Sequence, residues 1–355
     1  MAFEIDLLPV GSEKKSGDCI AMRYGDLVKG KEKQTVIVVD GGYAGTWKDK
    51  LKPFLRKYYN CEIDGKIHID YVILSHPDQD HVSGLVEMAK DEDVKIEKIM
   101  MHRPWEELSP SWFKDGRITK DSLKNRLGDA FEKAKELDDI TINVTKAKLN
   151  VGNYNYQGAS ITILGPTLDF YKTCIANCEK TPQQENDVKN LPQTHGSNRS
   201  IVLEPYRYGN IKWDDNENTS AINESSLIIL FEYDGVKVLL TGDAGKKGLT
   251  NAINYAYVNN ITLNDCNIIK MPHHGSRKNV NPSIMKKFAG SEKLYYSCAS
   301  DDLGHHPSKR LINLMKEKGF KQYSTSGKYL HWGKDAPNRG WDAASDYGFF
   351  NEIEK

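Results

Sequence analysis

Four potential metal ligands stand within six residues of this chain, in the segment HPDQDH. His76, Asp78, Asp80 and His81 include two carboxylates, which would repel each other and serve no packing purpose unless a cation lay between them. The residues before them read as a buried strand, and the residues after them repeat apolar side chains at helical spacing. Alternation at the strand end places the first three ligands on one side, and the helix start brings His81 beside them. The segment therefore predicts a strand-to-helix turn that feeds two neighbouring metals.

Three further groups of potential ligands also follow expected strands. They are Asp243 in LLTGD, His273 and His274 in MPHHGS, and His305 and His306 in LGHHPS. A single strand-end aspartate is more often a turn or cap residue, and a histidine pair in a loop is usually surface. Their joint occurrence at strand ends in one chain nevertheless points to a shared metal centre.

The balance of charge limits the class of partner. Forty-nine Lys and Arg residues match forty-nine Asp and Glu residues, so the chain lacks the electrostatic footprint of a strong non-specific nucleic-acid binder. The amino terminus carries acidic Glu4 and Asp6 instead of the basic start of a secretory signal, and no apolar run approaches the length of a bilayer span. Six cysteines show no paired framework. We therefore expect a cytoplasmic protein with reduced thiols and no membrane span.

Short apolar segments alternate with helical periodicity, which predicts an α/β fold. The expected strands are residues 3–10, 18–25, 34–42, 68–76, 159–166, 225–235, 236–243, 266–272 and 293–300. The expected helices are residues 46–59, 82–90 and 123–137. Asp234 and Gly235 suit the two-residue turn of a hairpin. We expect one domain over residues 1–355 with insertions at about 104–150 and 167–222, the second of which is polar and too long for a routine connection.

The order of these motifs resembles the metallo-β-lactamase fold and, within it, the nuclease domain of ComEC-type competence proteins. The resemblance runs from a strand ending in Asp40 through HPDQDH, LLTGD and PHHGS to GHHP. Asp78 stands where most relatives carry a second histidine, as it does in the competence group, and Asn223, Ser226 and Leu227 match that group's NxxSL. The motifs cover roughly residues 1–100, 158–166 and 220–312. They imply a four-layer αββα sandwich, but nothing resembles the accompanying membrane channel, so DNA uptake does not follow.

The resemblance implies that His76 and Asp78 bind a first metal together with His273 or His274. Asp243 would bridge the first metal to a second one. Histidine-rich sites favour Zn²⁺, whereas the carboxylate of Asp78 hardens the first position and makes Mn²⁺ more plausible. We therefore expect two divalent ions, either Zn²⁺ or Mn²⁺.

Asp80 and His81 would bind the second metal. The resemblance gives them a histidine of GHHP as partner, His306, with the neighbouring His305 as the alternative. Asp80 and Asp243 are the residues expected to be catalytic.

A two-metal site predicts hydrolysis at phosphorus. Metals about 4 Å apart lower the pKa of a shared water and clamp the oxygens of an in-line displacement. We therefore expect a phosphodiesterase or nuclease whose partner is DNA, RNA or a nucleotide. Lys246, Arg277 and Lys309 follow the metal clusters and would form a local anion site, although solvated surface residues are the plain alternative. Asn223 and Ser226 would orient substrate or water, or only cap the hairpin.

Two other functions stay open. The same centre could hydrolyse a small-molecule phosphoester, thioester or lactam. The chain could instead be a regulatory binding module in which residues 167–222 cover the metal site. A substrate panel separates these alternatives, whereas the sequence indicates no protein partner.

Overall fold

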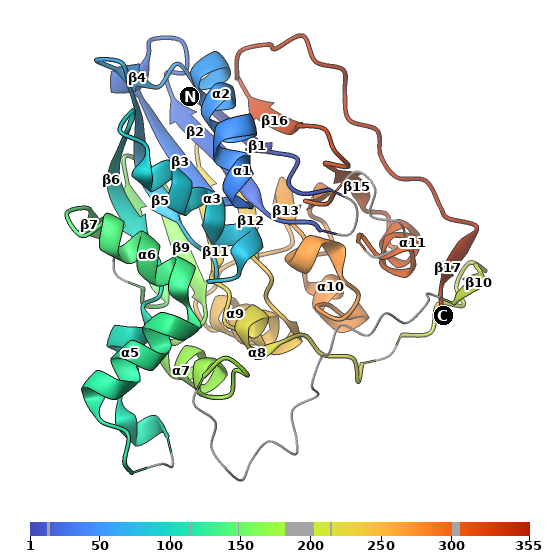
Figure 1. The fold of residues 1–355 in the computed structure, drawn as a ribbon. Helices are drawn as coiled ribbons and strands as arrows, with labels where there is room; N and C mark the ends of the chain where they lie inside the picture. The colour runs from blue at the N-terminus through green and yellow to red at the C-terminus, as the bar shows by residue number, and fades with distance from the viewer. Residues whose placement is uncertain (13–14, 114–115, 148, 182–201, 214, 300–305) are drawn as a thin grey trace.

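The computed structural model describes residues 1–12, 15–113, 116–147, 149–181, 202–213, 215–299 and 306–355. Two β-sheets pack face to face, and helices cover both outer faces (Figure 1). The first sheet has the order β16 (Leu330–Lys334), β1 (Ala2–Leu7), β2 (Cys19–Gly25), β3 (Gln34–Gly41), β5 (Lys66–Ile73), β6 (Val94–Met100) and β7 (Thr145–Lys146), with β4 (Glu62–Ile63) paired to β5. The second has the order β15 (Lys321–Ser324), β14 (Lys293–Tyr296), β13 (Ile268–Lys270), β12 (Val236–Leu240), β11 (Ile228–Tyr233), β9 (Ala159–Gly165) and β8 (Gly152–Tyr156). A separate ribbon pairs β10 (Leu203–Pro205) with β17 (Glu352–Glu354).

Three apolar clusters hold these layers together. The cluster between the sheets joins residues such as Phe3 and Ile37 of the first sheet to Phe231 and Val238 of the second. A second cluster lies between the first sheet and the helices α2 (Lys52–Phe54), α3 (Gln79–Lys90), α5 (Lys120–Ala130), α6 (Glu132–Ile140) and α7 (Leu168–Ala176), together with the π-helical segment Trp47–Leu51 that follows α1 (Ala44–Thr46). A third packs α9 (Lys246–Val258), α10 (Pro282–Lys287) and α11 (Lys309–Glu317) on the second sheet. The expected four-layer αββα sandwich is confirmed.

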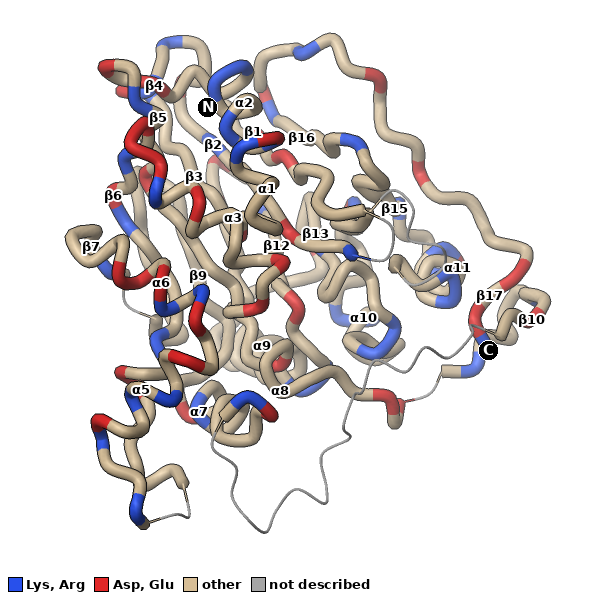
Figure 2. Tube along the Cα trace, viewed as in Figure 1, with Lys and Arg blue, Asp and Glu red and all other residues tan. Residues whose placement is uncertain are grey.

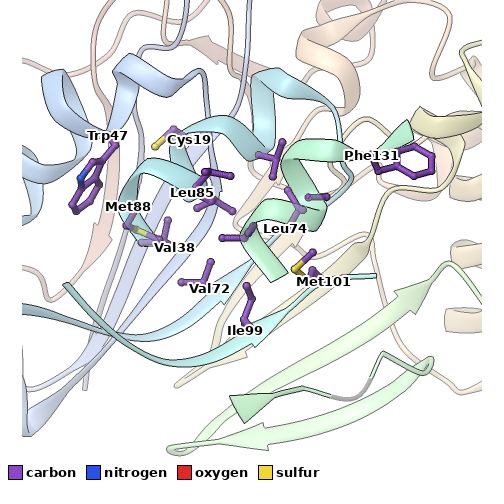
Figure 3. Close-up of a cluster of buried hydrophobic side chains, with 14 of the residues drawn as sticks. Cys19, Val38, Trp47, Val72, Leu74, Leu85, Met88, Ile99, Met101 and Phe131 are labelled. Atoms are coloured by element: carbon purple, nitrogen blue, oxygen red, sulfur yellow. The ribbon is translucent and has the colours of Figure 1, made fainter. Parts of the chain in front are cut away.

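Helix α3 illustrates how a helix is fixed to the first sheet. Its residues Leu85 and Met88 lie over Val38, Val72 and Ile99, which come from β3, β5 and β6 (Figure 3). All five side chains are fully buried. Because α3 begins within HPDQDH, this packing also positions the first ligand cluster.

Two sequence predictions differ from the structure in detail. The expected helix over residues 46–59 begins at Ala44 and includes π-helical turns at Trp47–Leu51 and Leu55–Tyr59, on either side of α2. The single helix expected over residues 123–137 is wrong, because α5 and α6 separate at Phe131, where φ is −120° and ψ is 44°. Its apolar stripe is buried as expected, and the periodicity continues through the break without revealing it.

The hairpin between β11 and β12 is confirmed. Tyr233 pairs with Val236, so Asp234 and Gly235 form a two-residue loop. Their φ angles are 48° and 76°, the left-handed values that this type of turn requires.

The region expected to hold insertions contains several helices. Residues 104–150 form α4 (Pro104–Glu107), α5, α6 and β7, and residues 167–222 form α7, β10 and the start of α8 (Ala221–Glu224). Residues 182–201, the centre of the expected covering segment, lie outside the described residues. Within the described part of the chain, no helix combines the length and apolar character needed to cross a bilayer.

A contact between two glycines sets the distance between α3 and β3. A Cβ at Gly84 would lie 1.9 Å from the carbonyl oxygen of Gly41, and one at Gly41 would lie 2.4 Å from the amide nitrogen of Leu85. The Gly84 amide donates to the Gly42 carbonyl at 2.9 Å. Only glycine allows this approach, so the pair holds the ligand-bearing end of α3 close to the sheet.

Gly84→Ala is therefore expected to lower the free energy of unfolding by about 1–3 kcal/mol, because the added methyl group must push α3 away from β3. Urea denaturation measures the loss, and metal content should fall with it. Gly128→Ala is the matched control. Gly128 lies in helix α5, and a Cβ added there would have no neighbouring atom closer than 3.6 Å. A Gly84→Ala protein as stable as the control would contradict the steric account.

Candidate metal centre

The two sheets bring their parallel strand ends to one place. In the first sheet β3, β5 and β6 are parallel, and in the second β12, β13, β14 and β15 are parallel. Parallel strands end at the same edge of a sheet, so the segments after β5, β12 and β13 leave from neighbouring positions. These segments carry HPDQDH, Asp243 and the first histidine pair.

HPDQDH forms the strand-to-helix turn that the sequence predicts. Asp78 is the N-cap residue of α3, but its carboxylate makes no capping hydrogen bond and lies 3.7 Å from His76 Nε2. Asp80 and His81 stand in the first helical turn, with Asp80 Oδ2 3.7 Å from His81 Nε2. The Asp78 side chain therefore does not cap the helix, as an N-cap aspartate usually does, and lies beside His76 instead.

The histidines after β13 occupy a strained turn. His273 and His274 both have left-handed backbones, with φ of 47° and 55°. Two consecutive non-glycine residues in this region cost of order 1–3 kcal/mol each, and such strain concentrates at functional sites. The sharp turn points both imidazoles towards Asp243.

One group of donor atoms surrounds Oδ2 of Asp243. His76 Nε2 and His273 Nε2 each lie 3.9 Å from this oxygen, and Asp78 lies beside His76. The structure thus brings together the residues expected at the first metal, with His273 as the histidine of the pair.

A second group contains Asp80, His81 and His274. His274 Nε2 is 3.4 Å from Asp80 Oδ2 and 3.8 Å from Asp243 Oδ2, and His81 Nε2 is 3.5 Å from Asp243 Oδ1. Asp243 therefore contacts both groups, as a bridging ligand would. His274 thus lies beside Asp80 and His81, whereas the expectation for His306 stays a prediction.

His306 lies beside both histidines of the MPHHGS pair. Its ring centroid is 5.3 Å from that of His273 and 6.0 Å from that of His274. Its neighbour His305 lies outside the described residues.

The donor set fits divalent cations. Ligand atoms around a tetrahedral metal at about 2.0–2.1 Å stand about 3.3–3.5 Å apart. The second group comes close to this value, with separations of 3.4–3.8 Å, whereas those of the first group are longer, at 3.7–3.9 Å. Within the described chain, His76 Nε2, His81 Nε2, His274 Nε2 and Asp243 Oδ1 are buried without a hydrogen-bond partner. Buried polar atoms are almost always satisfied. Four such atoms converging on one point therefore indicate a site for cations.

Outer hydrogen bonds fix the tautomers of three imidazoles. His81 Nδ1 donates to Asp40 Oδ2 at 2.8 Å, and His274 Nδ1 donates to the carbonyl of Ser297 at 2.8 Å. His273 Nδ1 donates to Asn279 Oδ1 at 3.1 Å. The side-chain amide of Asn279 is oriented in turn because its Nδ2 donates to the backbone carbonyl of Asp243. Each bond leaves Nε2 as the lone-pair donor, as metal-ligating histidines require.

A buried ion pair lies directly beneath the cluster. Lys270 is fully buried at the end of β13, its ammonium contacts the Asp18 carboxylate, and it lies 3.8 Å from Asp243 Oδ1. Asp18 Oδ1 is in turn 3.2 Å from His274 Nδ1. Burial disfavours charge on Asp18, but Lys270 and His274 hold the pKa of this carboxyl below its ordinary value. The pair thus places one fixed positive charge among the carboxylates.

The carboxylates also act on the histidines. Burial alone would lower the pKa of His274, but Asp243, Asp18 and Asp80 raise it to about 10. Asp243 and Asp80 likewise outweigh burial and raise the pKa of His81 well above its usual range. Burial lowers the pKa of His273 despite Asp243. The metal-free second group therefore carries protons at neutral pH, whereas His273 is neutral.

Metal binding is expected to release protons for this reason. Cations need neutral imidazoles, so one proton should leave from each of His81 and His274, whose pKa values are both raised. The apparent affinity should therefore fall as the pH falls, by about tenfold per unit below about 10 for the proton of His274 alone. Calorimetric titration with Zn²⁺ or Mn²⁺ in buffers of different ionisation enthalpy counts these protons. Binding with no proton release at neutral pH would contradict the assignment of this group.

The residues predicted to bind substrate have different surroundings. Asn223 Nδ2 lies 3.2 Å from His273 Nδ1 and borders the first group. Ser226 is fully buried, and its hydroxyl accepts from the Asp243 amide at 3.1 Å, so it supports the bridging residue from below.

The three predicted cations contact other parts of the chain. Lys246 donates to the carbonyl of Asp215, Arg277 pairs with Glu217 at 3.0 Å, and the ammonium of Lys309 lies over the Phe350 ring. Their role in substrate binding stays a prediction.

Sequence reasoning missed Asp18, Lys270 and Lys180. Lys270 carried a signal, because it interrupts an apolar run that reads as an interior strand, where a lysine needs a buried partner. Asp18 has no comparable signal, since its partners are distant in sequence. Lys180 Nζ lies 2.9 Å from Asp78 Oδ1, and this contact also depends on the fold.

One family model matches the part of the chain that carries the first ligand cluster. The family model described as the metallo-beta-lactamase superfamily matches residues 27–147, which contain HPDQDH. No curated protein matches the chain.

Among solved structures, the metallo-beta-lactamase fold protein YhfI from Bacillus subtilis is 11% identical with a TM-score of 0.44, covering 94% of this chain and 100% of that one. Zn²⁺-bound PqqB from Methylobacterium extorquens is 8% identical with a TM-score of 0.46, covering 93% and 99%. A diphosphatase from the PhnP family is 10% identical with a TM-score of 0.41, covering 94% and 98%.

The two-sheet architecture with helices on both outer faces is that of the metallo-β-lactamase fold, and the matched residues 27–147 contain the first ligand cluster. The described chain also holds a cluster of histidines and carboxylates that could bind a metal ion.

Proposed function

We propose that the chain is a two-metal phosphodiesterase, acting on a nucleotide or nucleic acid. The observation that carries the proposal is Asp243, whose two oxygens lie within 3.5–3.9 Å of histidines from both donor groups. Bound divalent ions would supply Lewis acidity and a water of lowered pKa. Asp243 holds the two positions together, and the hydrogen bonds from His81, His273 and His274 keep their Nε2 atoms directed inwards. The likeness of the motif order to competence nucleases supports the choice of phosphodiesters.

A small substrate is the second candidate, and one observation favours it. Lys246, Arg277 and Lys309 are engaged within the chain, and Lys and Arg are interspersed with Asp and Glu along the described chain (Figure 2). A long nucleic acid gains most of its affinity from many phosphate contacts, which such a surface does not concentrate. A small phosphoester needs only the centre itself. The thioester, lactam and regulatory alternatives remain, the last because the centre of its covering segment lies outside the described residues.

A substrate panel with metal controls tests the proposal. Purified protein is stripped with a chelator, reloaded with Zn²⁺ or Mn²⁺, and given single-stranded DNA, double-stranded DNA, RNA, cyclic nucleotides and bis(p-nitrophenyl) phosphate. We expect metal-dependent cleavage of at least one phosphodiester. Turnover of a thioester or lactam alone would replace the proposal by the corresponding alternative. Tight metal binding without turnover of any substrate would favour a regulatory module.

A further inference from the structure

Lys180 lies against a candidate ligand of the first metal. Its Nζ is 2.9 Å from Asp78 Oδ1, and 51% of the Lys180 side chain is exposed. The backbone beside it is held firmly, since the Thr181 hydroxyl donates to the carbonyls of Ile175 and Cys178 at 2.9 and 2.7 Å. The ammonium is therefore held by an anchored turn against Asp78, a partly exposed member of the donor cluster.

The balance of charge at the cluster gives Lys180 a special place. Five carboxylates belong to the cluster and its outer contacts, namely Asp18, Asp40, Asp78, Asp80 and Asp243. Two divalent ions together with buried Lys270 would neutralise all five. Lys180 then supplies surplus positive charge beside Asp78, the most exposed of the five carboxylates.

Lys180 differs from the cations that the sequence predicted for substrate binding. Arg277, for example, is paired with Glu217, which stands outside the donor groups. The partner of Lys180 is itself a ligand position. A divalent ion held through Oδ2 of Asp78, the oxygen that faces His76, would repel the ammonium on Oδ1 and weaken this ion pair, while the ammonium stays a few ångströms away.

We propose that Lys180 is the substrate-anion contact of the first metal position. Asp78 holds its ammonium in the metal-free protein, and metal binding at His76 and Asp78 frees it to bind an anionic oxygen of the ester. This inference rests on the proposed hydrolase function and restricts the substrate to esters that carry negative charge beside the scissile bond.

Lys180→Gln tests the inference, because it should strengthen metal binding and weaken the binding of an anionic substrate. Loss of the competing ammonium should tighten metal binding by the apoprotein about two- to fivefold, as measured by chelator competition, because a half-exposed ion pair to Asp78 no longer has to be broken. The KM for anionic bis(p-nitrophenyl) phosphate should rise about tenfold with little change in kcat, since one charged hydrogen bond to substrate is lost. The KM for neutral p-nitrophenyl acetate should not change, and Lys180→Arg should retain most of the binding.

Lys90→Gln is the matched control. Lys90 is 44% exposed and pairs with Glu136 at 2.7 Å on the far end of α3. It should alter neither metal affinity nor KM. If Lys180→Gln weakens metal binding, or raises the KM of both esters alike, Lys180 is a structural residue and the inference is overturned.

Binding of inorganic phosphate separates this inference from the proposed function. Phosphate should raise the melting temperature of the metal-loaded wild type more than that of Lys180→Gln. If no ester is cleaved but this difference is present, the proposed function fails while the anion contact stands. If esters are cleaved and Lys180→Gln equals wild type in phosphate binding, metal affinity and KM, the anion contact fails alone.

Discussion

Asp243→Asn is expected to reduce hydrolysis by about 10³-fold and to lower metal content to one ion per chain or less. The amide keeps the size of the side chain but loses the negative charge and one acceptor oxygen. Both donor groups depend on this carboxylate, since its oxygens approach His76, His81, His273 and His274. A lost bridging ligand removes several kcal/mol of charge stabilisation from the reaction, and about 4 kcal/mol corresponds to this fold-change.

Metal analysis and steady-state kinetics measure the two effects. Asp234→Asn is the control, because it makes the same chemical change in the β11–β12 turn, where φ is 48° and asparagine is well suited. Near-native folding of Asp243→Asn should be visible by circular dichroism. A variant that keeps two metals and wild-type turnover would remove Asp243 from the centre and overturn the two-metal proposal.

The sequence was most informative where donor atoms are local. HPDQDH alone indicated a metal site, because two carboxylates and two histidines within six residues have few other uses. The strand-end positions of Asp243 and the first histidine pair then followed from the alternation of strands and helices. A fold in which parallel strands end at a common edge converts these separate positions into one cluster.

The assignment of histidines within the pairs needed the structure. His273 and His274 are adjacent, and only their left-handed backbones send both rings towards Asp243. Sequence spacing offers no way to distinguish this turn from one that directs a single ring inwards. The place of His306 at the second metal stays a prediction.

The missed residues share a physical property: their roles depend on contacts between distant segments. Asp18 and Lys270 are 252 positions apart and meet only because the two sheets pack face to face. Lys180 is 102 positions from Asp78. Patterns in the sequence identify functional residues that lie close together in one segment. Ion pairs between distant segments can be identified only in the folded chain.

Lys270→Met is expected to lower the free energy of unfolding by about 3 kcal/mol, the lower end for a broken buried pair, because the Asp18 carboxylate loses its ammonium partner and keeps only His274 as a nearby cation. Methionine fills a similar volume, so the loss reports charge rather than a cavity. The measurement is urea unfolding with a chelator present, which removes the contribution of bound metal. Lys237→Met is the control on the neighbouring strand, since Lys237 forms a solvent-accessible pair with Asp265 at 2.9 Å and should cost about 1 kcal/mol or less.

The double variant Asp18→Asn/Lys270→Met decides whether the pair acts as a unit. Removing both charges should recover much of the lost stability, since neither member of the pair is left without the other.

The effect of Lys270→Met on the free energy of unfolding should also depend on pH. In the wild type the pKa of Asp18 is depressed, so its stabilising contribution is present at neutral pH and is lost as acid protonates it. In Lys270→Met the carboxylate destabilises the fold only while charged, so the difference from wild type should narrow as the pH falls. The electrostatic account fails if the loss of stability is equal at pH 7 and pH 5 and the double variant does not recover it. Lys270 would then stabilise the fold by packing and not by its charge.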